Sequence, residues 1–97
     1  MHIAVPYNTD RETARQRIDQ RLDQLLAQYS HYLTGQEKRW EGDTLYFNGS
    51  ARGFKASGTL QLTESEIVID GKLPLIAKPF EPRIKNTIER EAAAIFG

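Results

Sequence analysis

The side chains of this chain best suited to acid–base chemistry near neutral pH are its two histidines, His2 and His31. A zinc site would need both imidazoles together with carboxylates, because the chain has no cysteine to supply a thiolate ligand. The same lack of cysteine excludes disulfides and a thiol nucleophile. His31 lies near an expected helix end, where an imidazole commonly interacts with the terminal carbonyls. The sequence therefore predicts no metal site and no dissociable cofactor.

Other groups that could act in catalysis lack the necessary partners. Glu41 and Asp43 could form an acid–base pair, but this role needs a shaped cleft, and a tight turn explains both residues. Ser50, Ser57 and Ser65 have no histidine close in the sequence, and none lies in a nucleophile elbow. We therefore expect no catalytic residue and no enzyme activity.

Positive charge gathers in the first half of the chain at Arg11, Arg15, Arg17 and Arg21. These arginines could form an anion-binding patch, or they could pair with acidic residues on a solvated helix face. We favour the second interpretation, because Arg15 has Asp19 four residues further along, which is the spacing of a helical ion pair.

The composition is typical of one small domain, which is expected to cover residues 1–97. Lys plus Arg and Asp plus Glu both number 13, so we expect no nucleic-acid-binding face. No stretch approaches the roughly 20 apolar residues that span a bilayer, and none resembles a secretory leader. We therefore expect a soluble, cytoplasmic protein without a transmembrane segment, and the absence of cysteine agrees with a reducing compartment.

The strongest structural signal is the alternation of apolar and polar residues between Trp40 and Leu75. Spacing of period two places alternate residues on one face of a sheet, which we expect to be half buried. Turn residues at 42–43, 48–50 and 63–66 divide this stretch into four strands, and such short connections make an antiparallel meander. The inward face is expected to include Leu45, Phe47, Phe54, Leu60, Leu62, Ile67 and Ile69.

Two amphipathic helices flank this meander. Thr9 and Glu12 fit a capping box for a helix that reaches Leu33, after which Gly35 would close it. A second helix is expected after Pro79, where apolar residues again recur at helical spacing. The helix residues expected to face the sheet are Ile18, Leu22, Leu25, Ile84 and Ile88.

With a short strand at residues 2–6, the sequence predicts an α+β fold with the order β-α-β-β-β-β-α. In this two-layer sandwich, an antiparallel four-stranded meander and the N-terminal strand pack against the two helices.

The segment from Leu73 to Phe80 departs from both patterns, because Pro74 and Pro79 interrupt an apolar run. The prolines lack amide donors, so the residues between them should lie outside regular strand pairing. In one interpretation the apolar residues finish the last strand and cover the entrance of the second helix. In the other, four side chains contact a partner: Leu73, Leu75, Ile76 and Phe80.

Short motifs distributed along essentially the whole chain follow one another in a characteristic order. They are His2-Ile3, Pro6-Tyr7, Glu12-Thr13-Ala14-Arg15, the stretch Arg39-Trp40-Glu41-Gly42-Asp43-Thr44-Leu45, Gly58-Thr59-Leu60, Leu73-Pro74-Leu75, Ile84-Lys85-Asn86 and Phe96-Gly97. In this order the chain resembles the polyhydroxyalkanoic acid system protein family. The resemblance implies a role related to polyester storage granules in a bacterial cytoplasm, and it implies no defined reaction.

Two classes of function remain open. The first is a non-catalytic accessory protein of the polyhydroxyalkanoate storage-granule system, which would contact a granule, a granule-associated protein or a second copy of the chain. The second is a binding protein, or an enzyme, for a small hydrophobic ligand or acyl intermediate, with a groove between the sheet and the last helix as in helix-grip folds. We favour the first, because so short a chain needs most of its apolar side chains for its own core.

The melting temperature should not depend on divalent metal ions. A ligand that binds only the folded state raises stability by mass action. Because the sequence predicts no metal site, thermal unfolding followed by circular dichroism should have the same midpoint with EDTA, with zinc and with neither. A clear rise of the midpoint in zinc would contradict this prediction.

Overall fold

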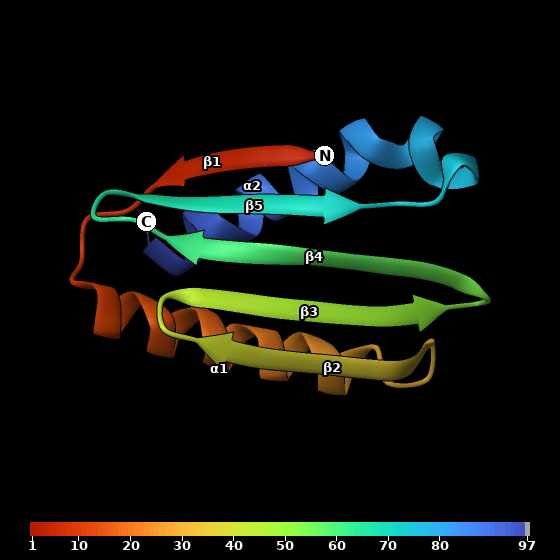
Figure 1. Cartoon of the computed structure of the whole chain (residues 1–97), viewed down its shortest axis with the longest axis horizontal. Coiled ribbons are helices and arrows are strands. Elements are labelled where there is room, and N and C mark those ends of the chain that lie inside the picture. The colour runs from red at the N-terminus through yellow and green to blue at the C-terminus, as the bar shows by residue number, and fades with distance from the viewer. Residues whose placement is uncertain (97) are drawn as a thin grey trace.

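The computed structural model describes residues 1–96, and its elements follow the order predicted from the sequence. They are β1 (His2–Pro6), α1 (Arg11–Gln28), β2 (Leu33–Glu41), β3 (Thr44–Ala51), β4 (Phe54–Leu62), β5 (Glu66–Lys72), the 3-10 helix η1 (Leu75–Phe80) and α2 (Glu81–Phe96). In this part of the chain the strands form one antiparallel sheet in the order β1-β5-β4-β3-β2. Both helices cover the same face of the sheet (Figure 1), which confirms the predicted α+β sandwich.

One row of side chains crosses all five strands on the buried face. Trp40 is opposite Leu45, Leu45 is opposite Leu60, Leu60 is opposite Ile69, and Ile69 is opposite Ile3. All but the half-buried Trp40 are almost entirely removed from water. A slip of one residue in any strand would turn its apolar set towards solvent, so this row fixes the register of the sheet. The predicted strand parity is confirmed.

The N-terminal strand lies beside the last strand of the sheet, far from β2 in the strand order. Ile3 is opposite Ile69, and the backbone N–H of Gly71 donates to the carbonyl of Met1 at 2.8 Å. The hydroxyl of Tyr7 donates to the carbonyl of Thr63. Through these contacts β1 pairs with the edge of β5 that does not face β4, and it adds a fifth strand to the meander.

The first helix is shorter than its apolar pattern predicts. It ends at Gln28 instead of Leu33, because Leu33 pairs with Ala51 as the first residue of β2, and strand pairing overrides the local helical preference. Gly35 does have a positive φ of 61°, but it lies at a bulge in β2 and does not close a helix. At the other end the cap is Asp10, whose carboxylate accepts from the N–H of Thr13 at 2.7 Å, so the predicted capping box is wrong.

The second hairpin turn lies at Arg52 and Gly53, and the turn predicted at residues 48–50 is wrong. Asn48 to Ala51 continue β3 in unbroken pairing with β4. Arg52 and Gly53 both have positive φ, 52° and 83°, which is the geometry that matches the twist of a two-residue hairpin. Phe54 therefore starts β4 at the tip of a long hairpin, and its side chain is exposed although the alternation predicted an inward position.

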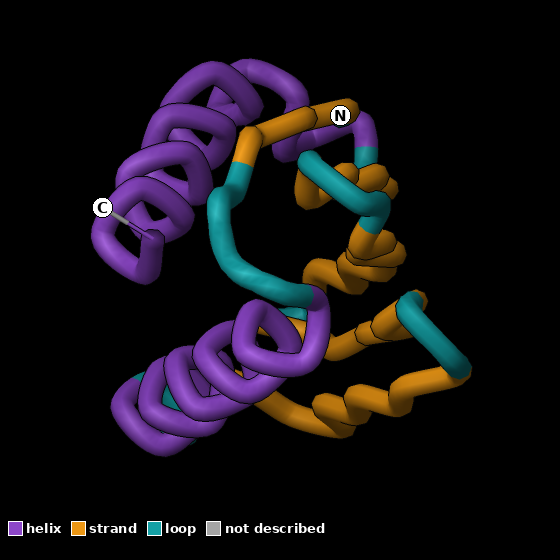
Figure 2. The backbone as a smooth tube through the Cα atoms, turned by 90° about the vertical axis from the view of Figure 1, so that its left-hand side faces the viewer, coloured by secondary structure: helices purple, strands orange, loops and turns teal. Residues whose placement is uncertain are grey.

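The two helices lie over different halves of the sheet. Ala14 and Ile18 of α1 are buried against the sheet, and Ala92 is the buried residue of α2. The other helix residues expected in the core are only half buried: Leu22, Leu25, Ile84 and Ile88. Figure 2 shows the helices as two separate rods on one side of the sheet. This separation leaves the apolar faces of both helices incompletely covered.

Replacing Leu62 by alanine should lower the free energy of unfolding by about 2–5 kcal/mol, because the side chain is buried and its loss leaves a cavity. Leu75→Ala is the matched control, since it removes the same atoms from a side chain that is 82% exposed, and it should cost no more than about 0.5 kcal/mol. Urea unfolding of the two variants tests this difference. If Leu62→Ala lowered the free energy of unfolding as little as Leu75→Ala does, Leu62 would not contribute to the core.

Candidate functional site

Most of the large apolar side chains that are exposed in residues 1–96 belong to segments at one end of the molecule. These segments are the end of α1, the loop before β2, the β3–β4 turn and η1, which all lie at the right-hand end of Figure 1. We call this surface the apolar end, and it consists of Tyr29, Tyr32, Phe54, Leu75, Ile76 and Phe80. Exposed apolar side chains gathered at one end of a molecule are candidates for an interaction site.

Three of the four residues predicted as a partner contact are prominent in this surface. Leu75, Ile76 and Phe80 are 82%, 65% and 56% exposed, whereas Leu73 is half buried. The strand ends at Lys72, so the interpretation in which Leu75 finishes the strand is wrong. Instead the segment forms η1, which begins after Pro74 and keeps its residues out of the sheet as the prolines predicted. That these residues contact a partner stays a prediction.

Cationic side chains accompany the apolar end. Exposed on these segments, or on the adjoining ends of β4 and β5, are Arg52, Lys55, Lys72 and Lys78. The guanidinium of Arg52 lies 5.4 Å from the ring centre of Tyr32, and Lys55, Lys72 and Leu73 line one shallow hollow of about 540 Å³. This end therefore combines apolar area with hydrogen-bond donors.

A second feature is an open apolar groove of about 390 Å³ between α1 and α2. It forms because α1 is attached at the β2 side of the sheet and α2 at the β1 side, so a gap stays open between the two helices. Its walls include Ile18, Leu22 and Leu25 of α1 and Ile88, Ala92 and Ile95 of α2, and its floor is Leu60, Ile67 and Ile69. Because the chain is small, we expected little room for a cavity. The space that the structure does contain lies between α1 and α2.

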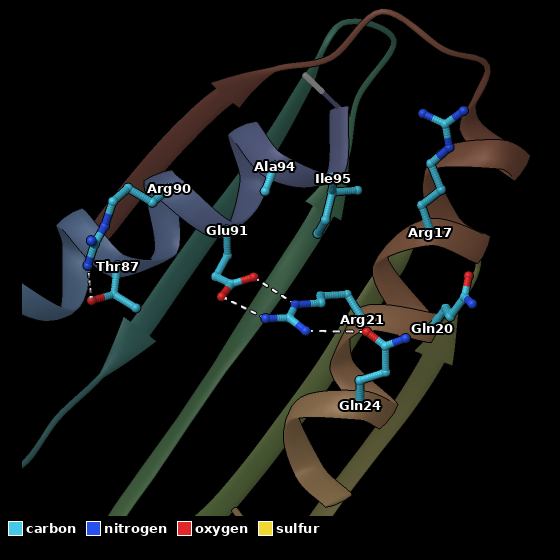
Figure 3. Close-up of a pocket in the computed structure, with 9 residues that line it drawn as sticks. All are labelled: Arg17, Gln20, Arg21, Gln24, Thr87, Arg90, Glu91, Ala94 and Ile95. Atoms are coloured by element: carbon cyan, nitrogen blue, oxygen red, sulfur yellow. Dashed lines mark hydrogen bonds and ion pairs between the residues drawn. The ribbon is translucent and has the colours of Figure 1, made fainter. Parts of the chain in front are cut away.

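An ion pair connects the two helices beside this groove. Arg21 donates from Nε and Nη2 to the two carboxylate oxygens of Glu91, at 2.8 and 2.9 Å, and a longer bond of 3.3 Å runs from Nη1 to Gln24 (Figure 3). Hydrogen bonds from Arg21 lower the pKa of Glu91, and Glu91 in turn raises the pKa of Arg21. The two parallel hydrogen bonds fix the orientation of the two side chains, which a single hydrogen bond would not do.

The outer side of this ion pair is a hollow of about 650 Å³ with excess positive charge. Arg17, Arg21 and Arg90 line it, and Glu91 is the only acidic residue among its lining residues. Figure 3 shows Arg17 and Arg21 on successive turns of α1, while Arg90 and Glu91 come from α2.

Three of the four arginines of α1 pair with acidic or aromatic groups, and these partners are distant in sequence. Arg11 binds Asp43 at 2.9 Å, and the guanidinium of Arg15 lies 4.7 Å from the centre of the Trp40 ring. The predicted helical pair of Arg15 with Asp19 is not formed within the described residues, because Asp19 faces β2 instead. The spacing of charged residues in the sequence identified the charged face of the helix, but it did not identify the residues that these arginines contact.

Asp19 is the centre of a half-buried polar cluster that attaches α1 to the sheet. Its Oδ1 accepts from Lys38 Nζ at 2.5 Å and from Trp40 Nε1 at 3.1 Å, and Lys38 also binds Asp23 at 3.1 Å. The hydrogen bond from Lys38 is the main cause that lowers the pKa of Asp19. Burial opposes the charge of Lys38, but its two carboxylate partners outweigh burial and raise its pKa. We interpret the cluster as structural, because each group is engaged in helix docking.

The remaining candidates from the sequence do not come together. His2 lies 2.5 Å from Asp70 on the exposed side of the sheet, and His31 is exposed in the loop after α1. Glu41 pairs with Arg39 at 3.3 Å, and Asp43 turns to the helix, as described above. Within residues 1–96 no three His, Cys, Asp or Glu side chains are grouped as metal ligands. No helix in this range is long and apolar enough to cross a bilayer.

Comparison with known proteins places the whole described chain in one group. The family model described as "Putative polyhydroxyalkanoic acid system protein" matches residues 1–96. Among curated proteins and solved structures, none matches the chain. The family match therefore covers every element of the fold, including the apolar end and both helices that form the groove.

The contribution of Asp19 to stability should depend on pH. Because hydrogen bonds hold its pKa in the folded protein below the ordinary value of 3.8, its contribution is fully present above that value and is lost as the pH falls through the lower pKa of the folded state. The urea midpoint of the wild type should exceed that of Asp19→Asn at neutral pH, and the difference should shrink between about pH 5 and about pH 2.

The control for this experiment is Glu89→Gln, which removes an exposed carboxylate of α2 and should change the midpoint little at any pH. A difference between wild type and Asp19→Asn that stays constant across this pH range would contradict the assignment.

Proposed function

Because the chain belongs to the polyhydroxyalkanoic acid system protein family, we propose that it is a non-catalytic accessory protein of the polyhydroxyalkanoate storage-granule system. In this role it binds a granule surface or a granule-associated protein through its apolar end. The observation that carries the proposal is the exposure of Leu75, Ile76 and Phe80 on one short helix.

The chemistry of a polyester surface fits this end of the molecule. A polyester presents alkyl groups together with ester carbonyls, which accept hydrogen bonds and donate none. Burial of apolar side chains contributes roughly 25 cal/mol per Å² of apolar surface. The nearby Lys72 and Lys78 supply donors for the carbonyls, so apolar and polar contacts can form together.

The backbone holds the exposed residues in place before any contact is made. Pro79 lies inside η1, Pro74 precedes it, and the N–H of Ala77 donates to the carbonyl of Pro74 at 2.9 Å. The next element is fixed as well, because the N-terminal ammonium lies 3.3 Å from a carboxylate oxygen of Glu81 at the start of α2. An ordered contact surface loses little conformational entropy on binding, which favours association.

This function places the protein in the cytoplasm at the granule surface, with no nucleic-acid partner. Each copy has only a few exposed apolar side chains, so one contact is weak, and many copies on one particle bind more tightly through multivalency. A homodimer formed through the same apolar end is the competing use of this surface.

The proposal is tested by co-sedimentation of the protein with polyhydroxyalkanoate granules. Ile76→Ser and Phe80→Ser, made separately, should each weaken binding about tenfold, because losing one buried apolar contact of this size costs about 1.5 kcal/mol. Tyr46→Ser is the control, since Tyr46 is an exposed aromatic residue of β3 outside the apolar end.

Circular dichroism establishes whether each variant is folded, and Leu75→Ser, at the most exposed of these positions, provides a third variant. Unchanged sedimentation of the folded variants would refute the proposal. Loss of self-association without loss of granule binding would assign the apolar end to a homodimer.

A second candidate function is the binding of a small hydrophobic ligand or acyl intermediate. The specific observation in its favour is the apolar groove between α1 and α2. In the less favoured alternative from the sequence, the groove lay between the sheet and the last helix, whereas the observed groove uses both helices as walls.

A further inference from the structure

We propose that the groove between α1 and α2 binds an alkyl carboxylate, with the alkyl chain in the groove and the carboxylate at Arg21 and Arg17. This inference rests on the second candidate function and names the chemical class of its ligand. It does not depend on granule binding by the apolar end, because the two surfaces use different residues, apart from Tyr29 at their border.

The groove suits an unbranched apolar chain. Its volume of about 390 Å³ falls in the range of ligand pockets, roughly 300–1,000 Å³. On the α1 side its lining runs from Ile18 to Tyr29, the residue that caps the end of the helix, which corresponds to about 16 Å along the helix axis. Nearly all other lining groups are aliphatic, so each methylene that leaves water gains about 0.8 kcal/mol without leaving a polar group unpaired.

The charged hollow beside the groove selects the head group. Three guanidinium groups against one carboxylate leave a net positive charge that attracts an anion. Glu91 occupies Nε and Nη2 of Arg21, while Nη1 has only the longer bond to Gln24. A carboxylate can therefore displace Gln24 and accept from Nη1 without breaking the ion pair between the helices.

Arg17 completes this head-group site. It lies four residues before Arg21, on the preceding turn of α1, and both residues line the hollow, whereas Figure 3 shows the Arg17 side chain pointing along the helix, away from the ion pair of Arg21 with Glu91. Among residues 1–96 Arg17 forms no ion pair shorter than 4.0 Å, whereas Arg21 is held in place by Glu91. Arg21 thus supplies a fixed donor, and a change of rotamer of the exposed Arg17 side chain can bring a second donor to the same carboxylate.

The ion pair between Arg21 and Glu91 marks the boundary between the groove for the alkyl chain of the ligand and the hollow for its carboxylate. Apolar side chains lie on the sheet side of the pair, and arginines and glutamines lie on its outer side. Because Arg21 lowers the pKa of Glu91, the pair stays charged at neutral pH and continues to connect the helices. An amphiphile with one anionic end matches this division, whereas a neutral alcohol matches only the apolar half.

The test is isothermal titration of the full chain with decanoate and 3-hydroxydecanoate, both below their aggregation concentrations, with decanol and decyltrimethylammonium for comparison. Both carboxylates should bind saturably at one site, and the neutral and cationic compounds should bind at least about tenfold more weakly. A tenfold change corresponds to about 1.4 kcal/mol.

Two kinds of variant locate the site. Arg17→Gln should weaken decanoate binding about tenfold, as expected for one lost charge-assisted hydrogen bond, while Arg83→Gln, an exposed arginine of α2 outside the hollow, should not. Ile95→Phe should weaken all alkyl ligands by filling the groove, and Leu25→Phe is a second filling variant if the first does not fold.

The result separates this inference from the granule proposal. Ile76→Ser should leave decanoate binding unchanged, and Arg17→Gln should leave granule sedimentation unchanged. The inference is overturned if decanoate does not bind the wild type, if Arg17→Gln binds as the wild type does, or if Ile76→Ser, and not the groove variants, abolishes decanoate binding.

Discussion

The apolar face of the sheet must be removed from water, and within residues 1–96 it is covered by two helices, α1 and α2. A helix with its side chains is about 10–12 Å wide, and the outer strands of a five-stranded sheet lie about 19 Å apart, so two helices side by side just suffice. Because α1 docks near β2 and α2 near β1, an open groove is left between the two helices. The groove, its charged hollow and the partial exposure of Leu22 and Ile88 all follow from this spacing.

The polar contacts set this spacing more than they add to stability. Asp19 fixes α1 to Lys38 and Trp40, and the N-terminal ammonium fixes the start of α2 through Glu81. The pair of Arg21 with Glu91 then connects the helices across the gap. Partly exposed ion pairs of this kind contribute little free energy each, but they restrict where a helix can lie on an apolar surface that has no directional preference of its own.

The two candidate sites differ in the kind of partner they can accept. The apolar end combines exposed apolar side chains with lysines, so it suits an extended surface such as a polymer particle or another protein. The groove is concave and ends in an arginine-lined hollow, so it suits one amphiphilic molecule. Membership of the polyhydroxyalkanoic acid system protein family is compatible with either use.

The sequence by itself determined the element order, the strand parity around Leu45, Leu60 and Ile69, and the unusual character of the segment after Lys72, because periodicity and proline chemistry are local properties. Only the tertiary structure decided where α1 ends, which residues form the second turn, and which side of the sheet receives the N-terminal strand. The groove was also decided only by the tertiary structure, since its wall residues Leu22 and Ile88 are far apart in the chain. Pairing between distant segments outweighs local propensity wherever the two conflict, so no local pattern could place Asp19 against Lys38 or Arg21 against Glu91.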